Sequence, residues 1–150
     1  ADAQALPFDD ETFDLVVCQF GVMFYPDKAR AHREARRVLR SKGHYLLVSS
    51  LGASPRSRVF YSRVKGEVEA DLLALGYPSV TIARPSLLAG PRAERRIGEQ
   101  LALRFGWLMP AKMKPIEARD VARALVRLAR EDQPGVRIVE SRELKAIAGG

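Results

Sequence analysis

Two stretches decide the fold, residues 13–20 (FDLVVCQF) and residues 44–50 (HYLLVSS). Each is a short apolar run beside polar turn residues, which is the pattern of a strand buried on both faces. Between them, residues 26–40 open with Pro-Asp and place apolar side chains at helical spacing, so we expect a helix that ends at Lys42-Gly43. A strand, a helix and a second strand in this order predict parallel pairing.

The remaining sequence continues the alternation of helix and strand. Ser57 is the expected cap of the next helix, and Gly76 is its expected stop. Further strands are expected at 79–83 and 136–140, and further helices at 92–104 and 117–130, with a tail to Gly150 that is either a short helix or frayed. We therefore expect one α/β domain over residues 1–150, with a mostly parallel sheet covered by helices on both faces.

The composition limits the partners and the compartment. The net charge is +7 and the pI about 10.0, but the basic residues are spread along several helices, so no specific nucleic-acid site is expected. No apolar run approaches the ~18–20 residues of a membrane span. A single cysteine, Cys18, and a start without a signal-peptide pattern predict the cytoplasm. No cluster of His, Cys or carboxylates has metal-ligand spacing, so no metal is expected.

The first part of the chain resembles one enzyme family. The stretches at 2–8 (DAQALPF), 13–16 (FDLV) and 37–43 (RVLRSKG) are similar to the middle of a class I S-adenosylmethionine-dependent methyltransferase. This resemblance, which covers residues 1–43, implies that Asp2 contacts the adenine amino group of the methyl donor. It also implies that Cys18 and Gln19 line the methionine end.

The second part, residues 44–144, resembles a different family. It is similar to the C-terminal half of an atypical short-chain dehydrogenase/reductase, with residues 145–150 as a tail. The resemblance implies a Rossmann-like, NAD(P)-binding fold and a small-molecule substrate. It rests on the stretches 48–53 (VSSLGA), 61–67 (YSRVKGE), 84–88 (RPSLL), 92–95 (RAER), 115–116 (PI) and 120–122 (DVA).

Tyr61 and Lys65 are the candidate catalytic pair, because a spacing of four puts both on one helix face. A tyrosine hydroxyl can exchange the proton of a substrate oxygen, and a nearby ammonium favours its phenolate form. The resemblance implies that Lys65 also reaches the cofactor ribose and that Ser50 orients the substrate. It further implies that Arg84-Pro85-Ser86 form the nicotinamide-side loop.

Several alternatives remain at this stage. Ser50 is equally explained as a strand-end serine that satisfies backbone groups, and Leu51 stands where the resembled family has another hydroxyl. The stretch 48–52 (VSSLG) partly matches a hydrolase nucleophile elbow, but it lacks the first glycine, and only His32 and His44 exist as bases. His32 is expected to face solvent. A noncatalytic assembly domain is a further hypothesis.

The 150 residues contain no Gly-x-Gly-x-x-Gly run, the turn that holds the phosphates of a dinucleotide. We therefore expect NAD(P), or alternatively S-adenosylmethionine, to bind weakly. In either resembled fold, strand 13–20 would have a further neighbour. Here we expect it at an edge, apolar and unpaired, and thus to form a homo-oligomer with another copy.

Overall fold

The computed structural model describes residues 1–19, 21–89, 114–131 and 133–149. The helix expected at 92–104 lies outside these residues. In the described ranges, four strands form a sheet in the order β1-β2-β3-β6. Its strands and their helices are β1 (Phe13–Cys18), a short 3-10 turn η1 (Gly21–Phe24), α1 (Lys28–Val38), β2 (Leu39–Val48), α2 (Phe60–Ala74), β3 (Ser79–Arg84), α4 (Ala118–Arg130), β6 (Gly135–Glu140) and α5 (Ser141–Gly149).

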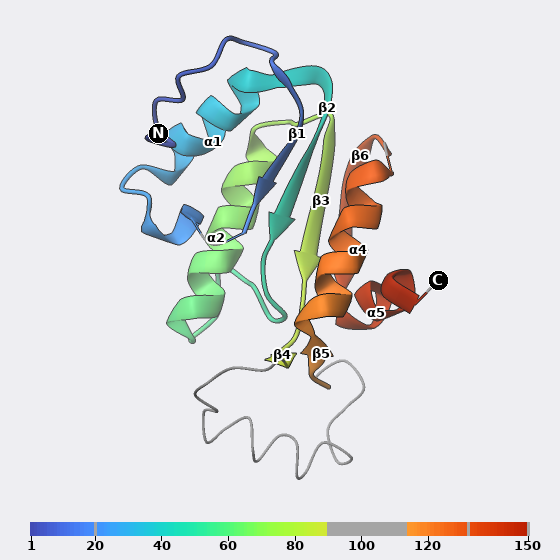
Figure 1. Cartoon of the computed structure of the whole chain (residues 1–150). Helices are drawn as coiled ribbons and strands as arrows, with labels where there is room; N and C mark the ends of the chain where they lie inside the picture. Colours follow the sequence, from blue (N-terminus) through green and yellow to red (C-terminus); the bar gives the residue numbers. More distant parts are fainter. Residues whose placement is uncertain (20, 90–113, 132, 150) are drawn as a thin grey trace.

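All three strand pairs of this sheet are parallel, which confirms the expected α/β fold. β1, β2 and β3 run side by side in Figure 1, with their carboxyl ends at the same edge, and β6 pairs with β3 in the same direction. Among the described strands β1 has one neighbour, β2, so its place at the edge is as expected. A separate two-stranded pair joins β4 (Leu88–Ala89) to β5 (Ile116–Glu117), which the sequence patterns did not predict.

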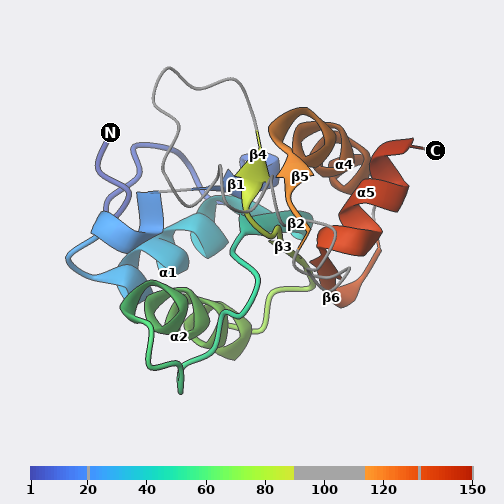
Figure 2. The ribbon, with the colours of Figure 1, turned by 90° about the horizontal axis from the view of Figure 1, so that it is seen from below.

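Helices cover both faces of the sheet. α1 and α2 lie on one face and α4 and α5 on the other, as the view along the strands in Figure 2 shows. Alternate residues of β2 point to the two sides: Tyr45 and Leu47 enter the core under α1 and α2, and Leu46 enters the core under α4 and α5. No described helix is long and apolar enough to cross a bilayer.

Two expected boundaries are wrong. α1 ends at Val38 and the chain passes directly into β2 at Leu39, so Lys42-Gly43 lies inside the strand. The reason is burial, since Leu39 is fully enclosed and belongs to the sheet core rather than to the last turn of a helix. Ser57 is not the N-cap of α2, because Val59 occupies that position. The Ser57 hydroxyl accepts a hydrogen bond from the Val59 amide instead.

Gly66 is required where a loop crosses α2. A Cβ at this position would overlap the backbone of Ser54 and Pro55, and the Ser54 amide donates to the Ser62 carbonyl at 3.0 Å to hold that crossing. We expect Gly66→Ala to lower the free energy of unfolding by about 2 kcal/mol, because backbone cannot move aside as a side chain can. Urea unfolding measures this change.

The matched control is Gly149→Ala, where a Cβ would meet nothing within 4 Å. That variant should unfold at the wild-type urea concentration or slightly above it, because alanine favours a helix. Equal midpoints for the two variants would show that the crossing at Gly66 is not tight.

Candidate functional site at the carboxyl edge of the sheet

The candidate site lies where β1, β2 and β3 end. Parallel strands place their carboxyl ends at one edge, and α/β sheets bind ligands in the crevice outside that edge. Cys18, Val48 and Arg84 are the last residues of the three strands. Three of the candidate residues named from the sequence, Ser50, Pro85 and Ser86, come shortly after these strand ends.

Lys65 is the most tightly placed of these residues. It projects from the second turn of α2, and only 1% of it is exposed. Its Nζ donates to the Val48 carbonyl at 3.0 Å and to the Gln19 carbonyl at 3.4 Å, so one ammonium joins the ends of β2 and β1. Burial lowers the pKa of Lys65, and the nearby Cys18 and Glu69 act in the opposite direction.

Two serines directly follow Val48, whose carbonyl accepts from this ammonium. Neither the Ser49 Oγ nor the Ser50 Oγ has a hydrogen-bond partner among the described residues, although both are buried. The loop itself is fixed by backbone, because the Ser49 amide donates to Ala83 and the Leu51 amide to Pro85. A buried hydroxyl without a partner costs ~1–3 kcal/mol, which suggests a place that a ligand completes.

Tyr61 lies one turn before Lys65, closer to the edge. It is 44% exposed, and its hydroxyl has no hydrogen bond within the described residues. The structure therefore puts the expected pair on one helix but does not join it, since the Lys65 ammonium faces backbone carbonyls instead. Contact between Tyr61 and Lys65 stays a prediction.

Arg84 has a structural partner that the sequence did not indicate. Its Nε donates to Glu69 Oε1 at 3.1 Å, and its Nη2 pairs with the other oxygen of the same carboxylate. The hydrogen bond from Arg84 to Glu69 raises the pKa of the guanidinium. Glu69 follows Lys65 by four residues, so the helix face that begins at Tyr61 also carries the anchor for the end of β3.

The other two residues of the expected loop also have structural contacts. Pro85 is buried and its carbonyl accepts from Leu51. The Ser86 hydroxyl donates to the Lys114 carbonyl at 2.7 Å, and the Ser86 amide donates to the Ser141 hydroxyl. The loop after β3 is thus tied to both β2 and the start of α5.

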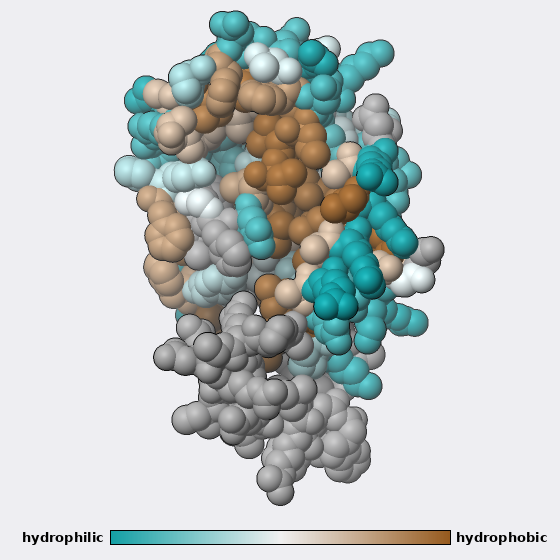
Figure 3. Space-filling model, in the orientation of Figure 1, coloured by the Kyte–Doolittle hydropathy of each residue, from teal (hydrophilic) through white to brown (hydrophobic). Residues whose placement is uncertain are grey.

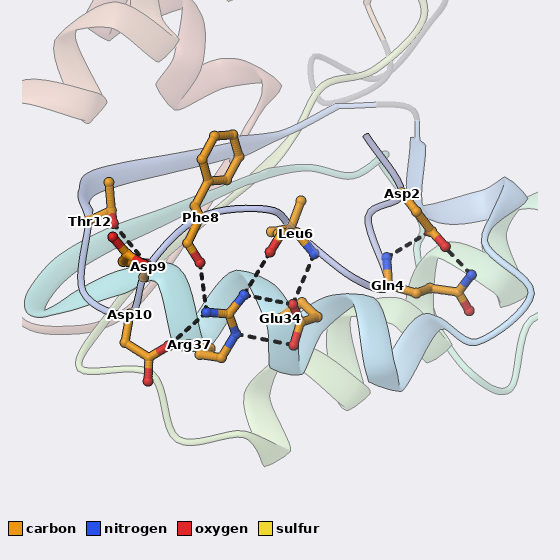
Figure 4. A network of polar contacts seen from close by, with 9 residues as sticks. All are labelled: Asp2, Gln4, Leu6, Phe8, Asp9, Asp10, Thr12, Glu34 and Arg37. Atoms are coloured by element: carbon orange, nitrogen blue, oxygen red, sulfur yellow. Dashed lines mark hydrogen bonds and ion pairs between the residues drawn. The ribbon is translucent and has the colours of Figure 1, made fainter.

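Asp2 lies apart from these residues in a segment that runs along α1. Its carboxylate is exposed and accepts from the Gln4 amide at 2.9 Å. The segment is held by Arg37, whose guanidinium donates to the Leu6 and Phe8 carbonyls and pairs with Asp10 (Figure 4). No described contact joins Asp2 to Cys18.

The expectation that His32 faces solvent is wrong. His32 is fully buried, its Nδ1 is 3.2 Å from the Tyr45 hydroxyl, and its carbonyl accepts from the Tyr77 hydroxyl at 2.6 Å. Burial lowers the pKa of His32, so the neutral ring is favoured. The helical spacing of Ala31, Ala35 and Val38 was the signal that could have placed His32 on the buried side of α1.

Residues 1–47 match the model of a methyltransferase domain. The match covers fewer than half of the 150 residues and ends inside β2, close to the change of resemblance expected near residue 44. It supports the methyltransferase-like interpretation of the first segment. It also favours S-adenosylmethionine over NAD(P), for which the comparisons give no support.

The chain is also similar to fungal proteins named "Protein FMP52, mitochondrial". It is 35% identical to the Coccidioides immitis protein over 130 residues, which is 82% of this chain and 51% of that protein. Identity to the Debaryomyces hansenii protein is 37% over 111 residues, 67% of this chain and 49% of that protein. The chain therefore spans about half the length of these curated relatives.

The expected cytoplasmic location is contradicted by these names, because the relatives are mitochondrial proteins. One cysteine argues against an internal disulfide, but it does not distinguish one reducing compartment from another. An alignment over 82% of the chain also extends well past residue 47, so both segments have relatives.

Proposed function

We propose that the carboxyl edge of β1 and β2 binds a ribose-containing nucleotide cofactor. The observation that supports this is the Lys65 ammonium, which donates to the Val48 and Gln19 carbonyls and has a third hydrogen without a partner among the described residues. The unpartnered hydroxyls of Ser49 and Ser50 follow directly after Val48. Together these groups supply the donors and acceptors that a ribose diol takes.

The first candidate function for this edge is that of a reductase. NAD(P)H would supply the hydride when bound, and Tyr61 would donate a proton from its hydroxyl to the substrate oxygen. Lys65 would hold the ribose and Ser50 would orient the substrate. Arg84 would act indirectly, because its pairing with Glu69 fixes the loop of Pro85 and Ser86. Binding is expected to be weak, since the sequence has no glycine-rich phosphate turn.

The match of residues 1–47 favours a second candidate, a methyltransferase-like nucleotide binder. S-adenosylmethionine would supply the methyl group. Asp2 would accept from the adenine amino group with the carboxylate oxygen that Gln4 leaves free, and Cys18 would line the methionine end.

The likeness to mitochondrial relatives further leads us to infer a mitochondrial location for this chain.

Calorimetric titration with NADPH, and separately with S-adenosylhomocysteine, tests the site. We expect Lys65→Met to weaken binding of the preferred nucleotide about tenfold, roughly the loss of one charge-assisted hydrogen bond. Methionine is similar in length to lysine but carries no charge, and a thermal melt checks that the variant folds. Lys42→Met is the matched control, because Lys42 is exposed in β2 and should leave binding unchanged.

The outcomes separate the two candidates. NADPH binding that Lys65→Met weakens, with Tyr61→Phe binding normally but losing carbonyl reduction, supports the reductase. Binding of S-adenosylhomocysteine alone supports the methyl donor. Absence of heat with either nucleotide at millimolar concentration overturns the proposal.

A further inference from the structure

A hollow lies between residues 114–116 and the first turns of α5. Its volume is about 230 Å³. Three of its lining side chains are cationic: Lys114, Arg142 and Lys145. At roughly 30 Å³ per water molecule, it has room for a small polar group with its first hydration partners.

The charge of this hollow is not balanced by its surroundings. No carboxylate of the described residues lines it, and none of the three cations forms an ion pair with one of them. Glu143, the acidic residue in the first turn of α5, is already bound by Arg137 at 2.8 Å. Glu117 and Glu140, the other carboxylates near the lining residues in sequence, are exposed. Like charges that converge on one space repel, and an anion between them relieves that repulsion.

Neutral hydrogen-bond donors in this hollow also favour an anionic ligand. Ser141 is buried and lines the hollow; its hydroxyl oxygen accepts from the Ser86 amide, so its own hydrogen remains for another acceptor. Ser141 is also the first residue of α5, whose first amides have no partner within the helix. A helix start alone would not define a site, but here it opens beside three unpaired cations.

We propose that this hollow binds the phosphate group of a phosphomonoester. A dianion suits three converging cations better than a carboxylate does, and its three terminal oxygens can accept from Arg142, Lys145 and the Ser141 hydroxyl at once. The Ser86 hydroxyl donates to the Lys114 carbonyl and so holds the main chain at Lys114. None of the residues that line this hollow is among those proposed to hold the nucleotide at Lys65, although the loop of Ser86 lies next to both.

Inorganic phosphate and glycerol 3-phosphate are the soluble probes, titrated into the whole chain and followed by amide NMR shifts at constant ionic strength. We expect saturable shifts at residues 114–116 and 141–146. The double variant Arg142→Gln/Lys145→Gln should weaken binding at least about tenfold. Arg119→Gln/Arg130→Gln is the charge-matched control, because both arginines are exposed on α4 and outside the hollow.

Vesicles that contain phosphatidic acid form a second arm and identify the source of the phosphate. Vesicle binding that only the pocket double variant loses would assign a lipid phosphate, and binding of the soluble probes would assign a small metabolite. Two results overturn the proposal: no saturable response to any probe, or equal weakening in the pocket and control variants.

Discussion

Replacing Glu69 with alanine is expected to lower the free energy of unfolding by about 3 kcal/mol, because it leaves the Arg84 guanidinium without its counter-charge. The Glu69 side chain is 5% exposed and that of Arg84 22%, so water replaces the lost carboxylate only in part. Urea unfolding at neutral pH measures the change. The loop that starts at Pro85 should also become more accessible to amide exchange.

The control for this prediction is Glu67→Ala on the same helix. Glu67 is exposed and lies 4.0 Å from Arg63, a pairing expected to contribute ~0.5 kcal/mol or less. The double variant Glu69→Leu/Arg84→Leu should recover most of the stability, because it removes both charges together. A Glu69→Ala protein as stable as the control would mean that the pair does not hold the end of β3.

The second large effect is expected at β1, where we propose that two copies of the chain associate. β1 has one described neighbour, and Val17 on it is 54% exposed. Figure 3 shows hydrophobic surface gathered over this part of the sheet. Strands of a parallel sheet are normally buried on both faces and paired on both edges, so a second β1 would satisfy both needs.

We expect light scattering to give a dimer mass at micromolar concentration, and Val17→Lys to raise the dissociation constant about 100-fold by placing a charge on the contact. Val136→Lys makes the same change at a 56% exposed valine on β6, the opposite edge, and should leave the dimer intact. A monomer mass for the wild-type chain at micromolar concentration would overturn the proposal. If Val136→Lys dissociates the dimer and Val17→Lys does not, the contact between the two copies lies at β6 rather than at β1.

Much of the fold could be predicted from local patterns, because apolar runs and helical spacing act over a few residues. The strand at 13–18 and the helix that stops at Gly76, with its φ of +60°, followed from such patterns. The edge position of β1 was expected from the resemblance to the two families instead. The boundary at Leu39 did not follow from local patterns, because helix and strand compete there. Burial in the sheet core decided between them.

The sequence identified several residues of the candidate site, but it could not predict which groups those residues contact. A spacing of four identified Tyr61 and Lys65, yet no pattern could show that the lysine binds the carbonyls of Gln19 and Val48. Those carbonyls become neighbours only when β1 and β2 pair. The Glu69–Arg84 pair was missed for the same reason, since its partners lie 15 residues apart on different elements.

The segment held by Arg37 has a consequence for how this chain tolerates change. Arg37 binds the carbonyls of Leu6 and Phe8, and Glu34 binds the Leu6 amide. These contacts are made to main-chain groups, which every amino acid provides except that proline lacks the amide hydrogen. Substitutions at residues 6 and 8 can therefore change the side chains while the contacts of this segment with Arg37 persist. Arg37 itself has no such latitude, because lysine lacks the planar fork that holds several acceptors at once.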